Sequence, residues 1–319
     1  MSRHWARTRE AGLLNGMRIL IWIHKHGGRL AFSLALLPVM AYFFVRRGDA
    51  RRACRHYLVR VRRCYPQALG NRSITWLSYV QFLTFGQSVL DKYLAWAETP
   101  SGIAMAPAEE EMLFGAARSG RGCLLIGSHF GNLEYSRGIA HRHPALTINV
   151  LMYDKHAQKF AALIAQSQPE ARMNLIQVTD LDFALALRLR EKVQNGEWVV
   201  IAGDRVPVST GEHVCEATFF GDRARFPVGP YVLASLLQCP VYLLHCFRDN
   251  SQYRLVLETF ASEVHLPRQN RQQAYEMNVQ KFATALERQV ARAPLQWFNF
   301  FDFWNDEDLP GRKITEAGN

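Results

Sequence analysis

The 319-residue sequence lacks the short motifs that mark several common classes of protein. Its six cysteines form no Cys-x-x-Cys pair, which argues against a zinc ribbon, a redox motif and a disulfide-stapled secreted domain. A glycine-rich dinucleotide fingerprint, a P-loop lysine pattern and a Gly-x-Ser-x-Gly nucleophile elbow are also absent. The sequence therefore gives no support for a nucleotide cofactor or a serine hydrolase, and its cysteine usage predicts a reducing compartment.

Acidic residues are scarce in the N-terminal part of the chain. Residues 1–63 contain 14 basic and two acidic residues, a net charge of +12, whereas the whole chain carries +10. Residues 64–319 therefore carry a net charge of −2. A basic segment can bind nucleic acid or anionic lipid, but here the basic residues flank apolar runs and no nucleic-acid-binding module is recognisable. We therefore expect a membrane surface as a partner and no nucleic acid.

The apolar run from Leu30 to Val45 has sixteen residues without a charge. As a helix at ~1.5 Å per residue it spans roughly 24 Å, less than the ~30 Å of a bilayer core, and Pro38 is expected to kink or break it. Residues 51–63 then place basic side chains around a helix, each worth ~1 kcal/mol beside anionic head groups. The pattern predicts a monotopic or re-entrant anchor; the alternatives are a single span, or a buried core helix with a solvated basic neighbour. We predict a membrane-associating segment at 1–66 and a catalytic domain at 67–319.

The rest of the chain alternates short apolar runs with amphipathic stretches, which is typical of an α/β fold with a mixed sheet flanked by helices. The predicted strands are 123–127, 147–153, 174–178, 198–203, 240–247 and 253–260. The predicted helices are 71–96, 182–194 and 272–292.

Aromatic residues concentrate in two places. In the helix predicted at 71–96, Trp76, Tyr79, Phe82 and Phe85 recur at steps of three, so one face is aromatic. This face either belongs to the core or lines a groove for an acyl chain. Residues 297–304 hold six aromatics in eight positions, too many for a solvated terminus. This tail either completes the core or meets the bilayer interface, where Trp is favoured.

The candidate chemistry follows the first predicted strand, where His129 precedes Glu134 by five residues. The ends of strands in α/β folds are common ligand sites. A histidine on this loop with a carboxylate in the next turn can form a pair of general base and orienting group. His129 would take a proton from an acceptor hydroxyl, and Glu134 would fix its tautomer and stabilise the imidazolium. The alternative is a helix-capping histidine beside a surface glutamate.

The stretch His129-Phe130-Gly131-Asn132-Leu133-Glu134 resembles the His-x-x-x-x-Asp/Glu block of the lysophospholipid acyltransferase superfamily, and in particular its bacterial lipid A late acyltransferase branch. A second stretch supports the resemblance, because Asp204-Arg205, Phe-Phe-Gly-Asp-Arg-Ala at 219–224 and Pro-Val-Gly-Pro at 227–230 follow in the order of that branch. The tail at 297–304 instead looks like the acyltransferases of aryl-polyene and related pigment-lipid gene clusters, which leaves the acceptor open.

The resemblance implies an acyltransferase-type fold and the transfer of an acyl chain from a thioester, on acyl carrier protein or coenzyme A, to a hydroxyl of a lipid or glycolipid. It implies no metal, no cofactor and no covalent acyl-enzyme, with His129 as general base and Glu134 as its orienter. The implied location is the cytoplasmic face of the bacterial inner membrane, peripheral, monotopic or single-span. Two alternatives stay open: a thioesterase or hydrolase that uses the same pair on water, and a catalytically silent lipid-binding protein.

Further residues are candidates for binding the substrate or its oxyanion. The backbone N–H groups of Phe130, Gly131 and Asn132 could receive the oxyanion at a helix start. Asp204, at a predicted strand end, is a candidate for binding the substrate. The neighbouring Arg205 is the best side-chain candidate for the oxyanion or a donor phosphate, with an ordinary salt bridge as the alternative. Weaker candidates are Arg172 and Arg223.

Overall fold

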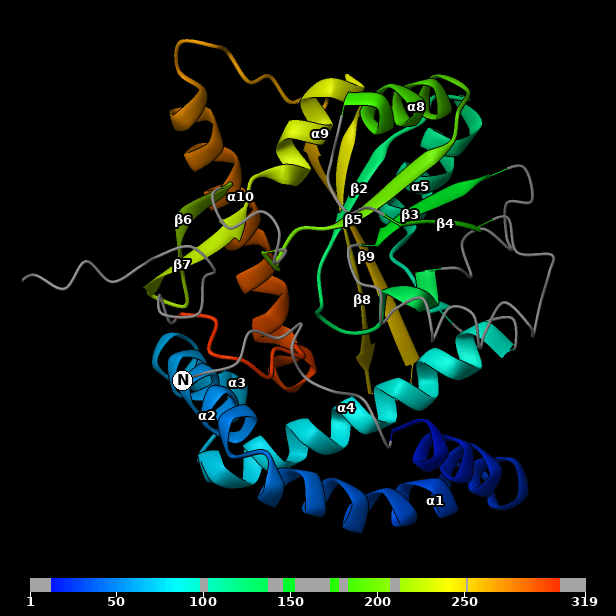
Figure 1. Ribbon diagram of the computed structural model, residues 1–319, viewed down its shortest axis with the longest axis vertical. Coiled ribbons are helices and arrows are strands. Elements are labelled where there is room, and N and C mark those ends of the chain that lie inside the picture. Colours follow the sequence, from blue (N-terminus) through cyan, green and yellow to red (C-terminus); the bar gives the residue numbers. More distant parts are fainter. Residues whose placement is uncertain are drawn as a thin grey trace, which may run out of the picture.

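The computed structural model describes residues 13–97, 103–136, 146–152, 173–177, 183–206, 213–250 and 252–304. Their centre is a seven-stranded sheet in the order β1-β9-β8-β2-β5-β3-β4, shown in Figure 1. Its strands are β1 (Ile103–Ala104), β2 (Leu124–Gly127), β3 (Ile148–Met152), β4 (Met173–Gln177), β5 (Trp198–Ala202), β8 (Val241–Asp249) and β9 (Gln252–Ala261). All neighbours pair in parallel except β8 and β9, which form an antiparallel hairpin. The mixed sheet and its six longer strands confirm the prediction.

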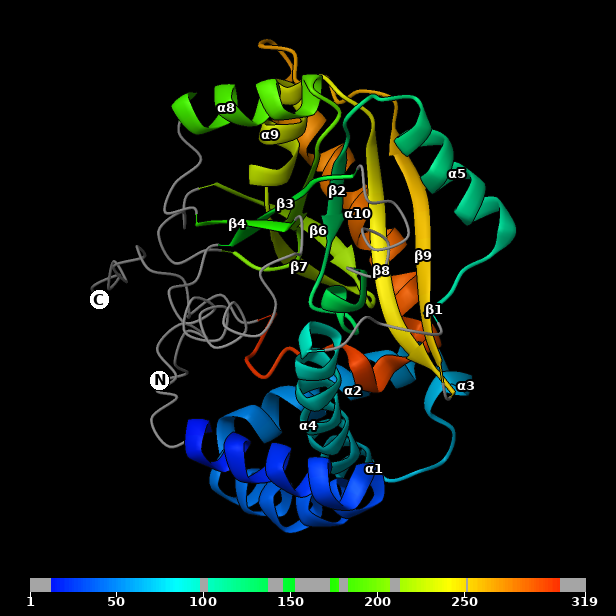
Figure 2. The same ribbon diagram turned by 90° about the vertical axis from the view of Figure 1, so that its right-hand side faces the viewer.

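The sheet is covered on both faces, which explains why its central strands are continuous apolar runs. In β2, Leu124 and Ile126 pack into the larger core cluster, and Leu125 packs into a second cluster on the opposite face with Leu113. Leu113 belongs to α5, and Figure 2 shows α5 on one side of the sheet with α9 and α10 on the other. In the described residues after position 103, the α-helices are α5 (Pro107–Arg118), α8 (Phe183–Gln194), α9 (Gly229–Leu237) and α10 (Arg271–Arg292).

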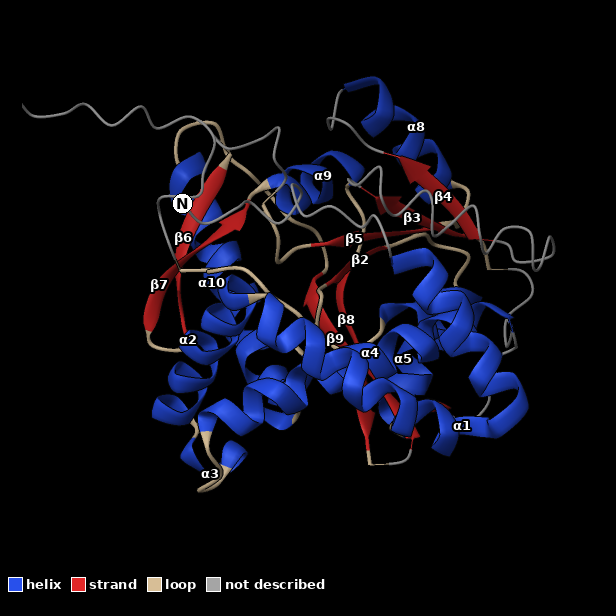
Figure 3. Ribbon diagram, turned by 60° about the horizontal axis from the view of Figure 1, so that its bottom comes forward, coloured by secondary structure: helices blue, strands red, loops and turns tan. Residues whose placement is uncertain are grey.

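The N-terminal helices gather at one end of the sheet, as Figures 1 and 3 show. They are α1 (Leu13–Arg46), α2 (Gly48–Cys64), α3 (Pro66–Leu69) and α4 (Ile74–Ala97). The basic helix α2 is part of the core, because Tyr57, Leu58 and Val61 are at most 1% exposed. Its arginines Arg60 and Arg63 pair with Asp222.

Helix α1 contains the whole apolar run from Leu30 to Val45 and begins well before it, at Leu13. Its backbone leaves the helical region at Gly28, whose φ of 69° suits glycine, and not at Pro38, which lies inside the helix. By length and composition, Ile19–Arg46 is a candidate membrane span, and only 11% of its most apolar window is buried. A core helix of a soluble protein would be mostly buried, so the exposure of α1 argues against the buried core helix considered from the sequence.

The Phe-Phe-Gly-Asp stretch is a turn between two strands that the sequence did not predict. These strands, β6 (Val214–Phe219) and β7 (Asp222–Pro227), form a separate antiparallel hairpin. Phe220 and Gly221 connect them with φ of 50° and 78°. Positive φ at both positions is the signature of a type I′ hairpin turn, which favours glycine at the second position.

The aromatic tail completes the core. Trp297 is fully buried, and Phe298 and Phe303 are at most 8% exposed. Phe82 and Phe85 on α4 pack edge-on against Phe300 at centroid distances of 4.9 and 5.0 Å. The buried part of the aromatic face of α4 is therefore core, whereas Trp76 at its start is 54% exposed.

Candidate active site

His129 and Asp204 meet because their strands are neighbours. His129 follows β2, Asp204 follows β5, and these parallel strands pair with Gly127 opposite Ala202. The pairing continues beyond the strands, since the Gly203 N–H donates to the Gly127 carbonyl at 2.9 Å. Parallel strands end at the same edge of a sheet, so both side chains reach one place although 75 positions separate them.

The Asp204 carboxylate holds the His129 residue at two points. Its Oδ1 lies 2.8 Å from Nδ1 of the ring, and its Oδ2 accepts the His129 backbone N–H at 2.9 Å. Oδ2 also accepts the indole N–H of Trp297 at 3.1 Å. Asp204 is fully buried, whereas the His129 side chain is 37% exposed. The carboxylate thus fixes the ring from inside and leaves its other edge accessible.

The charges around this pair set its protonation. Burial opposes ionisation of Asp204, but the His129 ring and Arg205 outweigh it, so the pKa of Asp204 lies below its usual value. An ionised carboxylate only accepts hydrogen bonds; Nδ1 therefore carries the proton and Nε2 keeps its lone pair. Burial and the Arg205 cation lower the pKa of His129 below 6.5, although Asp204 raises it. The ring is therefore neutral at pH 7, as a general base must be.

The loop after His129 is fixed by close backbone contacts. The Gly131 N–H donates to the Gln296 carbonyl at 2.8 Å, and the Asn132 N–H to the Cys246 carbonyl at 2.6 Å. Gly131 has a φ of 73°, and a Cβ there would lie 2.0 Å from the Cys246 oxygen, so only glycine fits.

These contacts differ from the oxyanion role expected of the loop. The Phe130 N–H donates to the Ser128 hydroxyl at 3.3 Å. The backbone N–H groups of Phe130, Gly131 and Asn132 therefore all donate hydrogen bonds within the protein. Directly after Asn132 the chain forms a 3-10 turn over Leu133–Ser136. These hydrogen bonds fix the shape of the loop, and an oxyanion role for its N–H groups stays a prediction.

Glu134 also lies elsewhere than the His–Glu pairing expects. In the 3-10 turn its carboxylate forms an ion pair with Lys92 of α4. The carboxylate that hydrogen-bonds Nδ1 of His129 is that of Asp204, at the end of β5. A part for Glu134 in the reaction stays a prediction.

Arg205 joins the site to the tail. Its Nε donates to Oδ1 of Asn299 at 2.9 Å, and its terminal nitrogen to the Phe298 carbonyl at 2.7 Å. The Phe298 N–H in turn donates to the His129 carbonyl at 3.2 Å. The Arg205 cation also lowers the pKa of His129, so Arg205 lies near the ring. A role for Arg205 at the oxyanion or at a donor phosphate stays a prediction.

Only one of the other two arginine candidates belongs to the part of the chain that the structure describes. Arg223 is 85% exposed on the β6–β7 hairpin and pairs with Glu216 of the opposite strand. Arg172 lies outside the described residues. In the part of the chain that the structure describes, no group of three His, Cys, Asp or Glu side chains could hold a metal ion.

Two residues of the site went unnoticed in the sequence. Trp297 is a hydrogen-bond donor to Asp204 and not only an apolar anchor; the aromatic density of the tail is its one signal. Lys92, the partner of Glu134, lies near enough to His129 to lower the pKa of the ring. A single lysine within a long amphipathic helix carries no signal of this kind.

Comparison with known proteins gives one family. The family model described as bacterial lipid A biosynthesis acyltransferase matches residues 67–305, a range that includes His129, Asp204 and the aromatic tail. A search of curated proteins finds no match. The family match confirms the resemblance that the motifs at 129–134 and 204–230 indicate.

Proposed function

Because the chain belongs to the bacterial lipid A biosynthesis acyltransferase family, it is an acyltransferase of lipid biosynthesis, and we propose that His129 is its general base and Asp204 its orienting group. The observation that carries the proposal is the hydrogen bond of 2.8 Å between Nδ1 of His129 and the buried, ionised Asp204. This bond leaves Nε2 as the accessible proton acceptor at the strand ends.

The proposed reaction is direct transfer. Nε2 of His129 takes the proton from the acceptor hydroxyl while the hydroxyl oxygen attacks the carbonyl carbon of an acyl thioester. The carbon–sulfur bond of the tetrahedral intermediate then breaks, and the leaving thiolate takes the proton back from the imidazolium. Asp204 stabilises the imidazolium between these steps. The donor is an acyl group on a phosphopantetheine arm, of acyl carrier protein or coenzyme A.

Arg205 supplies positive charge for the oxyanion. A fixed cation beside the reacting carbonyl stabilises the negative charge that develops there, typically by a few kcal/mol. Arg205 is held in place by Asn299 and Phe298 and acts on the neighbouring imidazole. Glu134 plays an indirect part, because its ion pair with Lys92 offsets a second cation near the ring.

Replacing Arg205 should change the pH dependence of the reaction. In the parent protein, kcat/KM should fall with decreasing pH only below 6.5, because His129 must be neutral and its pKa is lowered. Arg205→Gln removes a cation that lowers this pKa, so the acid limb should move to higher pH. The rate above the limb should drop by about tenfold, ~1.4 kcal/mol in the barrier. The measurement is kcat/KM from pH 5 to 8.

Two variants control this result. Arg205→Lys keeps the charge, so its acid limb should stay near that of the parent, and Arg223→Gln removes an arginine that is 85% exposed on the hairpin. If Arg205→Gln lowers the rate without moving the acid limb of the pH profile, Arg205 acts only by holding Phe298 and Asn299 of the aromatic tail in place.

The function itself is tested by following a labelled acyl group. Full-length protein is mixed with acyl-carrier-protein thioester or acyl-coenzyme A, and with a bacterial lipid extract. We expect the label in one lipid class, with an increase of one acyl mass. Label that appears as free fatty acid at the same rate without any acceptor would make the protein a thioesterase, and no turnover with either donor would leave a lipid-binding protein.

The exposed face of α1 supports contact with the cytoplasmic membrane surface. Its large apolar side chains Leu30, Leu34, Leu37 and Val45 are between 42% and 74% exposed. A row of this kind is costly in water and is expected where a helix meets lipid. The basic residues of α1 and α2 add attraction to anionic lipid.

Introducing charge on this face should release the protein from membranes. Burial in lipid is worth about 1.5–3 kcal/mol for each leucine, so Leu34→Glu with Leu37→Glu should weaken vesicle binding by roughly 100-fold or more. Flotation with liposomes measures the change. The matched control is Leu187→Glu with Met277→Glu, on exposed leucine and methionine of the catalytic domain. Equal binding of both double variants would remove α1 as the anchor.

A further inference from the structure

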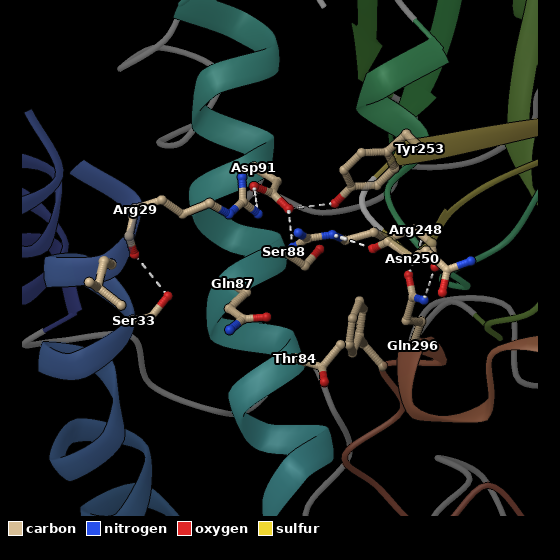
Figure 4. Close-up of a pocket in the computed structure, with 12 residues that line it drawn as sticks. Arg29, Ser33, Thr84, Gln87, Ser88, Asp91, Arg248, Asn250, Tyr253 and Gln296 are labelled. Atoms are coloured by element: carbon tan, nitrogen blue, oxygen red, sulfur yellow. Dashed lines mark hydrogen bonds and ion pairs between the residues drawn. The ribbon is translucent and has the colours of Figure 1, made fainter. Parts of the chain in front are cut away.

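A pocket of about 570 Å³ lies between α1, α4 and the turn of the β8–β9 hairpin. Figure 4 shows the side chains around it: Arg29 and Ser33 come from α1, Thr84, Gln87, Ser88 and Asp91 from α4, and Arg248, Asn250, Tyr253 and Gln296 from the opposite wall. Neither His129 nor Asp204 lines it, but Gln296 and Phe298 of its wall contact the loop that carries His129.

The charged groups of the pocket converge at its inner end. Asp91 is 1% exposed; it pairs with Arg29 at 2.7 Å and accepts the Tyr253 hydroxyl at 2.8 Å. Arg248 approaches the same carboxylate at 4.0 Å, which is an ion contact without a hydrogen bond. Its Nε donates to the Asn250 carbonyl at 3.2 Å.

This arrangement leaves an excess of positive charge. Two arginines and one aspartate are the ionised residues that line the pocket, a net charge of +1. Each guanidinium has five N–H donors. Among the described residues, Arg29 uses one of them in its hydrogen bond to Asp91, and Arg248 uses one in its hydrogen bond to Asn250. Arg29 and Arg248 are 43% and 31% exposed, so the remaining donors are open to a ligand with one negative charge.

The pocket borders the exposed apolar face of α1 at Leu30. Leu30 lines the pocket next to Arg29, and Leu30, Leu34 and Leu37 follow one another along the exposed face of the helix. Positive charge at the end of an exposed apolar row matches a molecule with an anionic head and apolar chains. A soluble phosphate would use the positive charge but not the apolar row.

We propose that this pocket binds the phosphodiester of an anionic phospholipid, with Arg29 and Arg248 at the phosphate and the acyl chains along Leu30, Leu34 and Leu37. Arginine is suited to phosphate because its planar fork donates two parallel hydrogen bonds. The inference rests on the membrane contact proposed for α1 and not on the acyl-transfer reaction.

The lipid would lie close to the catalytic loop. The Gln296 side chain lies in the pocket wall. Its Oε1 accepts the backbone N–H of Arg248 at 2.8 Å, and its Nε2 donates to the backbone carbonyl of Arg248 at 2.7 Å. The Gln296 carbonyl accepts the N–H of Gly131, two residues after His129. One residue thus joins the lipid pocket to the loop that carries the general base.

The test is native mass spectrometry of the full-length His129→Ala protein in a neutral maltoside detergent. Phosphatidylglycerol and phosphatidylcholine with identical chains are titrated, and the first bound lipid is counted. We expect phosphatidylglycerol to bind at least about fivefold more tightly, as one basic side chain is worth ~1 kcal/mol at an anionic head group. The inactive background separates this result from any failure of acyl transfer.

Two variants probe the pocket without breaking the buried pair of Arg29 and Asp91. Arg248→Gln removes one phosphate donor, and Gln87→Glu adds a negative charge from α4. Both should abolish the preference for phosphatidylglycerol, whereas Arg223→Gln on the distant hairpin should retain it. Circular dichroism confirms that each variant is folded.

Two outcomes would overturn the proposal. If Arg248→Gln and Gln87→Glu keep the full preference for phosphatidylglycerol, the lipid does not bind here. If glycerol 3-phosphate displaces phosphatidylglycerol at equal concentration, the site recognises a soluble phosphate and not a lipid. Incomplete displacement by a large excess of glycerol 3-phosphate supports the lipid.

Discussion

The substitution His129→Ala should lower kcat for acyl transfer by about 10²–10⁴-fold, the usual contribution of a positioned general base. Without the imidazole, the acceptor hydroxyl loses the proposed general base that takes its proton. KM for the acyl thioester should change little, because the imidazole is assigned to the reaction and not to donor binding. Initial rates with labelled donor and saturating acceptor measure the effect.

The folded state should survive this change. Asp204 would still accept the backbone N–H of residue 129 and the indole N–H of Trp297. His265→Ala is the matched control, because that side chain is 77% exposed and lies far along the chain. A folded His129→Ala protein that transfers acyl groups at the parent rate would refute the proposed mechanism.

The substitution Asp204→Asn should be nearly as damaging, with a loss of about 10³–10⁴-fold in kcat. Oδ2 of Asp204 accepts two N–H groups, so the amide oxygen of asparagine would take that position. The new amide nitrogen would then face Nδ1 of His129 and donate to it. The ring would have to carry its proton on Nε2, where the acceptor hydroxyl needs a base.

Glu134→Gln is the informative comparison for this result. The Glu134 carboxylate pairs with Lys92, so its loss should leave the tautomer of His129 intact and cost much less than Asp204→Asn in kcat. A larger loss in Glu134→Gln than in Asp204→Asn would restore the His–Glu pairing expected from the motif and remove Asp204 as the orienting group.

Most of the fold could be predicted because each buried strand is a short apolar run bounded by polar or small residues. The runs at 123–127 and 198–203 correspond closely to β2 and β5. The hairpin β6–β7 was missed, since its strands alternate buried and exposed residues only over six positions each and include charged side chains. Its turn was noticed only as a motif.

The sequence predicted His129 and Asp204 as separate candidates but not their contact, for a topological reason. His129 and Asp204 each stood out as polar residues after a buried strand, but β3 and β4 lie between β2 and β5 in the sequence. Only the sheet order, in which β2 pairs directly with β5, shows that the two side chains touch. The close spacing of His129 and Glu134 instead favoured a local pair, which the 3-10 turn does not form.

The backbone partners of the catalytic loop could not be predicted for a related reason. The local sequence predicts a loop followed by a helix. It does not reveal that the carbonyls of Gln296 and Cys246 accept the N–H groups of Gly131 and Asn132. Contacts between segments more than a hundred positions apart follow from the tertiary fold and not from the local pattern.

The most direct test of the account is the tautomer of His129, measured by ¹⁵N NMR of histidine-labelled protein, with the signal assigned by its loss in His129→Ala. At pH 7.5 we expect a neutral ring with its proton on Nδ1 and an unprotonated Nε2. In Asp204→Asn the proton should move to Nε2, and in Glu134→Gln it should stay on Nδ1. A proton on Nε2 in the parent protein, or a tautomer that changes in Glu134→Gln and not in Asp204→Asn, would contradict the account.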